Sequence, residues 1–269
     1  MSDEPVNWFY GLMAERVAVL TPEPYQVPFL LRAIERFGQP VLDLGCGTGR
    51  LLLPILRAGV DVEGCDISGD MLHHCIDKAL RDGFRPHLYE QPMHSFLIPR
   101  LYQTIYIWDA FNLAGGREKA LTTLKCCFEH LHEGGALIFN VEAEYANSEW
   151  WEKWNPTKPI LLPEPWPEEG KHCIAADGSE YVESYRLVST DMLEQTYVCE
   201  VRIEKWVSGE LAATQQASMH GSIYMKNEVI LMLQVAGFYC ISVCGDYTDA
   251  SATQESHELI FTALKKCSV

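Results

Sequence analysis

Basic residues are scarce in this sequence. It has 21 lysine and arginine residues against 37 aspartate and glutamate residues, which leaves a formal net charge of -16 at pH 7. No stripe of basic residues interrupts this excess, so nucleic acid or an anionic membrane surface would be repelled. The acidity is compatible with a cationic or amine ligand, although net charge of this size also serves solubility.

Patterns typical of membrane, disulfide-rich or zinc proteins are also absent. No apolar run approaches the roughly 20 residues that a membrane helix needs. The first residues, MSDEPVNWFYGLM, contain no charged region followed by an apolar run. The ten cysteines are scattered without a C-x-x-C pair or a recurring spacing, so neither a zinc site nor a disulfide framework is indicated. We therefore expect a cytoplasmic chain with reduced thiols and no metal centre.

The chain is long enough to bury a large core, because 48% of its 269 residues are hydrophobic. Strand-like and helix-like segments alternate as far as residue 142. This alternation predicts an α/β fold whose parallel sheet is covered by helices on both faces. The expected strands are 40–45, 60–66, 85–91, 102–109 and 136–142, and the expected helices are 29–37, 48–58, 68–83 and 116–135.

The alternation breaks after residue 142. Residues 147–170 are rich in tryptophan and proline, which favours an irregular segment with at most a short helix. Three runs with a period of two follow, and turn-forming pairs such as Asp177-Gly178 separate them, so they predict an antiparallel sheet. They span 179–188, 192–207 and 210–225, and a helix at 227–238 and strands at 239–247 and 257–266 complete the chain. We therefore divide it into a domain of residues 1–142 and 225–269 and an insertion of residues 143–224.

The stretch VLDLGCGTGR, residues 41–50, joins a predicted strand to a predicted helix through three glycines. Gly45, Gly47 and Gly49 lack the Cβ atoms that would block a ligand from the backbone, and the free N–H groups at the helix end attract electron-rich atoms. Asp66 stands 21 positions after Gly45, at the end of the next strand. A carboxylate there can accept both hydroxyls of a ribose. Together these features predict a nucleoside-containing cofactor at the carboxyl ends of the strands.

Two cofactor classes compete for such a loop. A dinucleotide fingerprint would require glycine at position 50, where this sequence has Arg50. The spacing G-x-G-x-G with Asp43 two residues before the first glycine, followed by VEGCDIS, instead resembles motif I and the next strand of class I S-adenosylmethionine-dependent methyltransferases. LHEGGALIFNV resembles the fifth strand of that family, and GFYCISVCGDY with HELIFTALKK resembles its closing hairpin.

The resemblance implies a Rossmann-like, seven-stranded mixed sheet in the order 3-2-1-4-5-7-6, with strand 7 antiparallel. It implies S-adenosylmethionine as cofactor and S-adenosylhomocysteine as product, with an N-terminal segment around Tyr10 and Arg16 covering the site. Asp66 would hold the ribose, and Ile67 and Met71 would pack on the adenine. The cofactor-binding residues implied are Asp43, Gly45, Cys46, Gly47, Gly49, Asp66, Ile67, Met71, Gln91, Pro92, Met93 and Trp108.

The sequence departs from the family at the adenine edge. Pro92 stands where such enzymes often carry an acid that accepts a hydrogen bond from the adenine amino group. Proline can neither accept through its side chain nor donate through its nitrogen. Gln91 or a backbone carbonyl is the remaining acceptor, and the N–H of Met93 remains available as a donor.

The acceptor is expected to lie at the exit of the fourth strand, where the sequence reads WDAFN. This is not the [DN]-P-P-[YF] run shared by enzymes that methylate nucleic-acid bases. The insertion resembles the β-rich cap of small-molecule N- and O-methyltransferases. We therefore predict in-line methyl transfer to a small-molecule amine or hydroxyl, with His220, Asp109 and Tyr185 as candidate catalytic residues. Nucleic acid and membrane are not expected partners, and a homodimer stays open.

Two other functions remain open at this point. A nicotinamide-dependent oxidoreductase would use a similar strand-loop-helix unit, although Arg50 argues against it. A non-catalytic cofactor-binding subunit would show a large exposed apolar patch, which the sequence does not reveal.

Overall fold

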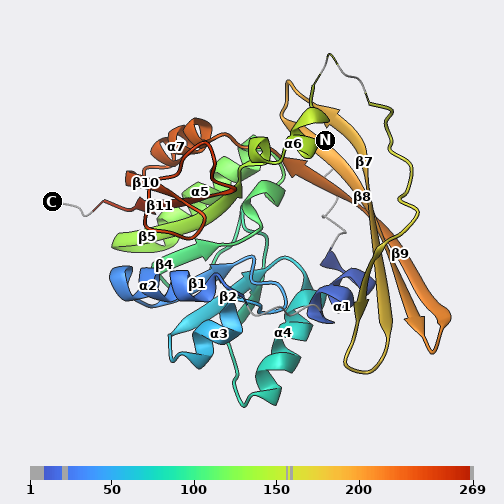
Figure 1. The fold of residues 1–269 in the computed structure, drawn as a ribbon. Coiled ribbons are helices and arrows are strands. Elements are labelled where there is room, and N and C mark those ends of the chain that lie inside the picture. Colours follow the sequence, from blue (N-terminus) through green and yellow to red (C-terminus); the bar gives the residue numbers. More distant parts are fainter. Residues whose placement is uncertain (1–8, 20–23, 156, 158–159, 267–269) are drawn as a thin grey trace.

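Two sheets organise the chain (Figure 1), a computed structural model that describes residues 9–19, 24–155, 157 and 160–266. The larger sheet has seven strands in the order β10-β11-β5-β4-β1-β2-β3, and the smaller has four in the order β6-β7-β8-β9. Within the described residues, no helix has the length and apolar character needed to cross a membrane.

The larger sheet has the predicted order 3-2-1-4-5-7-6. Its parallel pairs are β1 with β2 and β4, β2 with β3, and β4 with β5, whereas β11 runs antiparallel to both β5 and β10. The strands are β1 (Val41–Leu44), β2 (Val62–Asp66), β3 (Leu88–Glu90), β4 (Tyr102–Ile107), β5 (Leu131–Glu142), β10 (Tyr239–Gly245) and β11 (Glu258–Leu264). The predicted Rossmann-like fold is therefore confirmed.

Helices cover both faces of this sheet, as the alternation of segments predicted. Successive strand residues point to opposite faces, so Leu42 belongs to one core cluster and Val41 to the other. The first cluster packs against α5 (Arg117–His130) and α7 (Lys226–Val235), and the second against α2 (Val27–Phe37), α3 (Leu52–Arg57) and α4 (Gly69–Arg81). Ser68 caps α4 as its position predicted, because its Oγ accepts from the N–H of Met71 at 3.2 Å.

Two boundaries differ from the prediction. The helix expected to end at a glycine pair ends at His130, and β5 begins at Leu131. Gly134 has φ of +76°, and a Cβ on Gly135 would lie 3.0 Å from the carbonyl oxygen of Gln103. The pair therefore bends the start of β5 close to β4 instead of stopping the helix. The short strand β6 (Lys171–Ile174) was not predicted, because it follows directly on the proline-rich segment.

The smaller sheet forms a cap beside the carboxyl ends of the larger sheet (Figure 1). It consists of β6, β7 (Glu180–Asp191), β8 (Thr196–Val207) and β9 (Glu210–Ser222), all antiparallel as predicted. The tight turn at Ser208 and Gly209, with φ of +53° and +81°, joins β8 to β9. The short helices η3 (Glu144–Ala146) and α6 (Ser148–Glu152) connect β5 to this cap. The strands lie within residues 143–224, and the division into domain and insertion stays a prediction.

The helix α1 (Leu12–Val19) ties the cap to the larger domain. Its Leu12 and Met13 pack with Tyr181 in the cap, and Arg16 forms a buried ion pair with Glu183 of β7. Just before the helix, the Tyr10 hydroxyl donates to the Ile67 carbonyl oxygen at 2.9 Å. The N-terminal segment therefore spans from the start of α4 to the inner face of the cap (Figure 1).

Candidate active site

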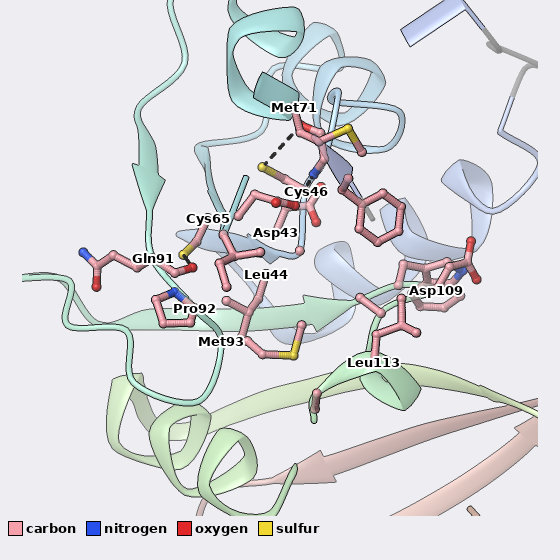
Figure 2. Close-up of a pocket in the computed structure, with 18 of the residues that line it drawn as sticks. Asp43, Leu44, Cys46, Cys65, Met71, Gln91, Pro92, Met93, Asp109 and Leu113 are labelled. Atoms are coloured by element: carbon pink, nitrogen blue, oxygen red, sulfur yellow. Dashed lines mark hydrogen bonds between the residues drawn. The ribbon is translucent and has the colours of Figure 1, made fainter. Parts of the chain in front are cut away.

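A cavity of about 580 Å³ opens at the carboxyl ends of β1, β2 and β4 (Figure 2). Asp109, a candidate catalytic residue, is part of its wall, and so are Phe9 and Val17 of the N-terminal segment. The size suits a ligand of several hundred cubic ångströms. Of the predicted cofactor-binding residues, all but Gly49 line it: Asp43, Gly45, Cys46, Gly47, Asp66, Ile67, Met71, Gln91, Pro92, Met93 and Trp108.

The glycine loop presents bare backbone to this cavity. Gly45 and Gly47 have φ of +86° and +52°, a region that residues with a side chain rarely adopt. A Cβ on Gly45 would lie 3.0 Å from the Cβ of Ala110. Gly49 has another role: a Cβ there would lie 2.6 Å from the Sγ of Cys75, so this glycine lets the loop pack closely on α4.

Asp66 ends β2 and faces the cavity in a fixed orientation. Its Oδ2 accepts from the Gly47 N–H at 2.8 Å, and its Oδ1 accepts from the Ser68 N–H at 2.9 Å. Burial raises the pKa of this carboxyl, and the hydrogen bonds from Ser68 and Gly47 act in the opposite direction. Because each oxygen keeps a free lone pair, the group can still accept hydrogen bonds from a neighbouring diol.

Asp43 is a buried carboxyl with an unsatisfied oxygen. It is 2% exposed, and its Oδ2 has no hydrogen-bond partner among the described residues. Burial raises its pKa to about 7, although the Tyr106 hydroxyl opposite it on β4 and the Arg50 guanidinium lower it. A buried, unpartnered carboxylate oxygen is costly in isolation, so this atom fits a ligand that brings a positive charge or an N–H group.

The far wall of the cavity is built at the end of β4. Trp108 packs against Phe29 and Tyr247, with ring centroids 6.2 and 5.7 Å away. Asp109 has φ of +53° and is paired twice: with Arg50 at 2.6 Å and with the side-chain amide of Asn140 at 2.7 Å. The sequence reasoning used Arg50 only as a position that is not glycine, and it missed this ion pair.

Gln91 was predicted to meet the edge of the adenine, but only its backbone is placed to do so. The Gln91 side chain accepts from the Leu97 N–H at 2.6 Å and points away from the cavity (Figure 2). This hydrogen bond closes the loop of residues 91–97, so the Gln91 side chain is not placed to accept a hydrogen bond from an adenine amino group. Within the described part of the chain, the Met93 N–H has no hydrogen-bond partner, and it remains a donor for a base.

Two candidate catalytic residues lie outside the cavity. His220 is exposed, and its neighbours Met219 and Gly221 on β9 pack against the opposite, inner side of the cap. Tyr185 lies on the inner side, but its hydroxyl donates to Glu183 at 2.6 Å, and Glu183 is paired with Arg16. The structure therefore brings Asp109 to the cavity and leaves His220 and Tyr185 away from it. No group of three or more His, Cys, Asp or Glu residues in the described ranges could hold a metal ion.

The comparisons with known proteins agree with this geometry. Residues 41–135 match a family model described as a methyltransferase domain. The chain is an S-adenosylmethionine-dependent methyltransferase with a Rossmann-like, seven-stranded fold. S-adenosylmethionine is therefore its cofactor, and the nicotinamide alternative that the sequence left open is wrong.

Relatives of this methyltransferase are distant. The protein YqeM of Bacillus subtilis (strain 168), named as a methyltransferase, is 23% identical over 84% of this chain and 83% of its own length. A protein of Geobacillus sp. (strain WCH70), also named as a methyltransferase, is 27% identical over 51% of this chain but only 56% of its own length. A crystal structure of an S-adenosylmethionine-dependent methyltransferase from Clostridium acetobutylicum ATCC 824 has the same fold, with a TM-score of 0.72, 15% identity and coverage of 95% and 97% of the two chains.

The cavity of this methyltransferase fits such a cofactor on three observations. A Cβ would fill the space over Gly45, the Asp66 carboxylate is oriented toward a diol, and Asp43 offers a buried oxygen without a partner. The glycine loop would hold the amino-acid part, Asp66 the ribose, and Ile67 and Met71 the adenine. When bound, the cofactor supplies a methyl group that its sulfonium centre has already activated.

The titration of Asp43 predicts a pH dependence of cofactor binding. Its pKa of about 7 means that the carboxyl is mostly neutral at pH 6 and mostly ionised at pH 8. Because S-adenosylmethionine is cationic, its affinity for the protein should rise by up to about tenfold from pH 6 to pH 8. Calorimetric titration at pH 6, 7 and 8 measures the effect, and Asp43→Asn should abolish the pH dependence. An affinity for the wild type that is constant or falls with pH would contradict the role of Asp43.

Proposed function

We propose that this methyltransferase acts on a small-molecule amine or hydroxyl that binds between the cofactor cavity and the inner face of the cap. The observation that carries the proposal is the placement of the N-terminal segment. Phe9 and Val17 line the cofactor cavity, while Leu12 and Met13 of the same segment pack on the cap. A chain segment that contacts both parts encloses a space suited to a small acceptor and excludes water from it.

The chain's own residues would then align the acceptor with the methyl group. Such alignment can contribute on the order of 7–11 kcal/mol to lowering a barrier. Asp109 lies in the cavity wall, held by Arg50 and Asn140, and we assign it a positioning role toward the acceptor because both of its oxygens are already engaged. His220 receives no role, because it lies on the outer side of the cap.

Charge and cysteine state support the rest of the proposal. The net charge of -16 disfavours a nucleic-acid acceptor. The nine described cysteines are free thiols, which is consistent with a reducing compartment such as the cytoplasm. Among the described strands, β9 lies at one edge of the cap sheet, and its residues 211–219 carry no charge. An uncharged edge strand favours pairing with a second copy of the chain, so we include a homodimer in the proposal.

Turnover against defined panels tests this function. The purified protein is incubated with S-adenosylmethionine and a panel of small amines, a panel of small alcohols and phenols, or DNA and RNA oligonucleotides, and S-adenosylhomocysteine is measured by mass spectrometry. We expect product with at least one small molecule and none with the oligonucleotides. Light scattering on the same sample gives the oligomeric state. Cofactor binding without turnover on any panel would instead favour the non-catalytic subunit.

A further inference from the structure

A glutamine of the cap is bonded to the backbone of the N-terminal segment. Gln215 lies on the inner face of β9, where its partner in register on β8, Ile203, packs with Leu12 of α1. The Gln215 Oε1 accepts from the Leu12 N–H at 2.7 Å, and the Gln215 Nε2 donates to the Tyr10 carbonyl oxygen at 3.0 Å. The side-chain amide therefore pairs with this backbone through both of its polar ends, much as a neighbouring strand would.

The residue between these two hydrogen bonds is a glycine for a steric reason. Gly11 has φ of +59°, and a Cβ there would lie 2.8 Å from the Gln215 Oε1. A side chain at this position would be strained, and it would also push the glutamine away from the backbone. The segment is therefore shaped to accept this glutamine.

On its other side, the same segment is bonded to the start of α4. The Phe9 carbonyl oxygen accepts from the Ser68 hydroxyl at 2.5 Å, and the Tyr10 hydroxyl donates to the Ile67 carbonyl oxygen at 2.9 Å. The Ser68 N–H in turn donates to the Asp66 carboxylate at 2.9 Å. The segment that leads into α1 therefore lies between α4 and the cap, and α1 itself continues along the cap strands (Figure 1).

These bonds place Phe9 in the wall of the cofactor cavity. Phe9 lines the cavity, as do Ile67 and Met71, to which we assign the adenine. Because its carbonyl group is bonded to Ser68, directly after Ile67, Phe9 lies at the end of the cavity that would hold the adenosine. An aromatic ring there buries apolar surface of the ligand and keeps water from it. Gln215 does not itself line the cavity, so any effect on the ligand passes through the segment.

We infer that Gln215 is a positioning residue for the cofactor. From the cap, it holds the backbone on either side of Gly11, which fixes Phe9 at the adenosine end of the cavity and slows dissociation of the ligand. The cap thereby contributes to cofactor binding as well as to the proposed acceptor site. The inference concerns the cofactor alone and does not depend on which acceptor is methylated.

The chain offers a matched control for Gln215. Gln216 is the next residue on β9, it points to the opposite face of the strand, and it is exposed. Surface plasmon resonance measures the dissociation rate of S-adenosylhomocysteine, and calorimetry measures its Kd. Both are applied to the wild type, Gln215→Ala, Gln216→Ala and Gln215→Glu, and urea unfolding reports the stability of each variant.

Gln215→Ala should raise the Kd by about tenfold, mainly through faster dissociation, because two hydrogen bonds that hold the segment are lost. Gln216→Ala should stay within about twofold of the wild type, as is usual for an exposed position. Gln215→Glu keeps an acceptor for the Leu12 N–H but has no donor for the Tyr10 carbonyl group, so its Kd should lie between those of the wild type and Gln215→Ala.

A double-mutant cycle tests whether Gln215 acts through Phe9. Phe9→Ala removes the ring whose position the glutamine fixes. In that background, Gln215→Ala should change the Kd by no more than about twofold, because the two substitutions disrupt one shared interaction. A general loss of stability would instead weaken binding by the same factor in both backgrounds.

Three results would overturn the inference. The first is a Kd and a dissociation rate for Gln215→Ala that equal those of the wild type. The second is an equal loss of affinity in Gln215→Ala and Gln216→Ala, and the third is the full effect of Gln215→Ala repeated in the Phe9→Ala background. If urea unfolding shows that Gln215→Ala does not fold, Gln215→Glu is judged by the same three results.

Discussion

Asp66→Ala should raise the Kd for S-adenosylhomocysteine by at least about 100-fold, because hydrogen bonds to a charged group contribute about 1.5–3 kcal/mol each. The carboxylate is fixed by the N–H groups of Gly47 and Ser68, so it loses little entropy when a ribose diol binds. Removing it takes away both acceptors for the diol and also the anchor of the Gly47 N–H. Isothermal titration calorimetry measures the change directly.

Two further variants separate the ribose role from general damage to the fold. Asp77→Ala removes an exposed carboxylate from α4, and its Kd should match that of the wild type. Asp66→Asn keeps the shape and one acceptor oxygen, so its affinity should fall between the wild type and Asp66→Ala. A Kd for Asp66→Ala within about twofold of the wild-type value would contradict the assignment of Asp66 as the residue that binds the ribose.

Gly45→Ala should abolish measurable cofactor binding. The new methyl group would stand at a position with φ of +86°, 3.0 Å from the Ala110 Cβ and 3.9 Å from the Met93 Cε, and all three residues line the cavity that we assign to the ligand. The backbone strain of a residue with a side chain at this positive φ costs about 1–3 kcal/mol of folding free energy, which a chain with a core of this size tolerates. The loss of binding should therefore greatly exceed the loss of stability, when calorimetry is compared with urea unfolding.

Gly59→Ala is the matched control for backbone strain. Gly59 has φ of +82°, nearly the same as Gly45, and a Cβ there would meet nothing within 4 Å. Both substitutions introduce a similar backbone strain, and the contact with Ala110 makes Gly45→Ala the less stable of the two. Only Gly45→Ala should lose the ligand. Full binding by Gly45→Ala would mean that the ligand does not approach this loop closely.

The fold and the cofactor cavity follow from local signals in the sequence. The strand-loop-helix pattern around Gly45 and the acid at position 66 require only a strand, a glycine turn and the next strand in order. The topology of the sheet then brings the glycine loop and Asp66 together, and the Gly47 N–H donates a hydrogen bond to the Asp66 carboxylate. The antiparallel cap was also readable, because its strands alternate with a period of two between turn-forming residues.

The acceptor side was less predictable, because it depends on contacts between distant segments. The ion pair of Arg16 with Glu183 and the packing of Tyr197 on Gly221 join parts of the chain that no local pattern relates. Period-two patterning shows which residues share a face of β9, but most of that strand is exposed on both sides. It therefore could not tell that His220 faces outward.

The most direct test of the central claim is a crystal structure of the protein soaked with S-adenosylhomocysteine. The account predicts ribose hydroxyls within hydrogen-bond distance of the Asp66 carboxylate and the amino-acid part of the ligand against the backbone of Gly45 and Gly47. A ligand bound elsewhere, or a ribose turned away from Asp66, would contradict it.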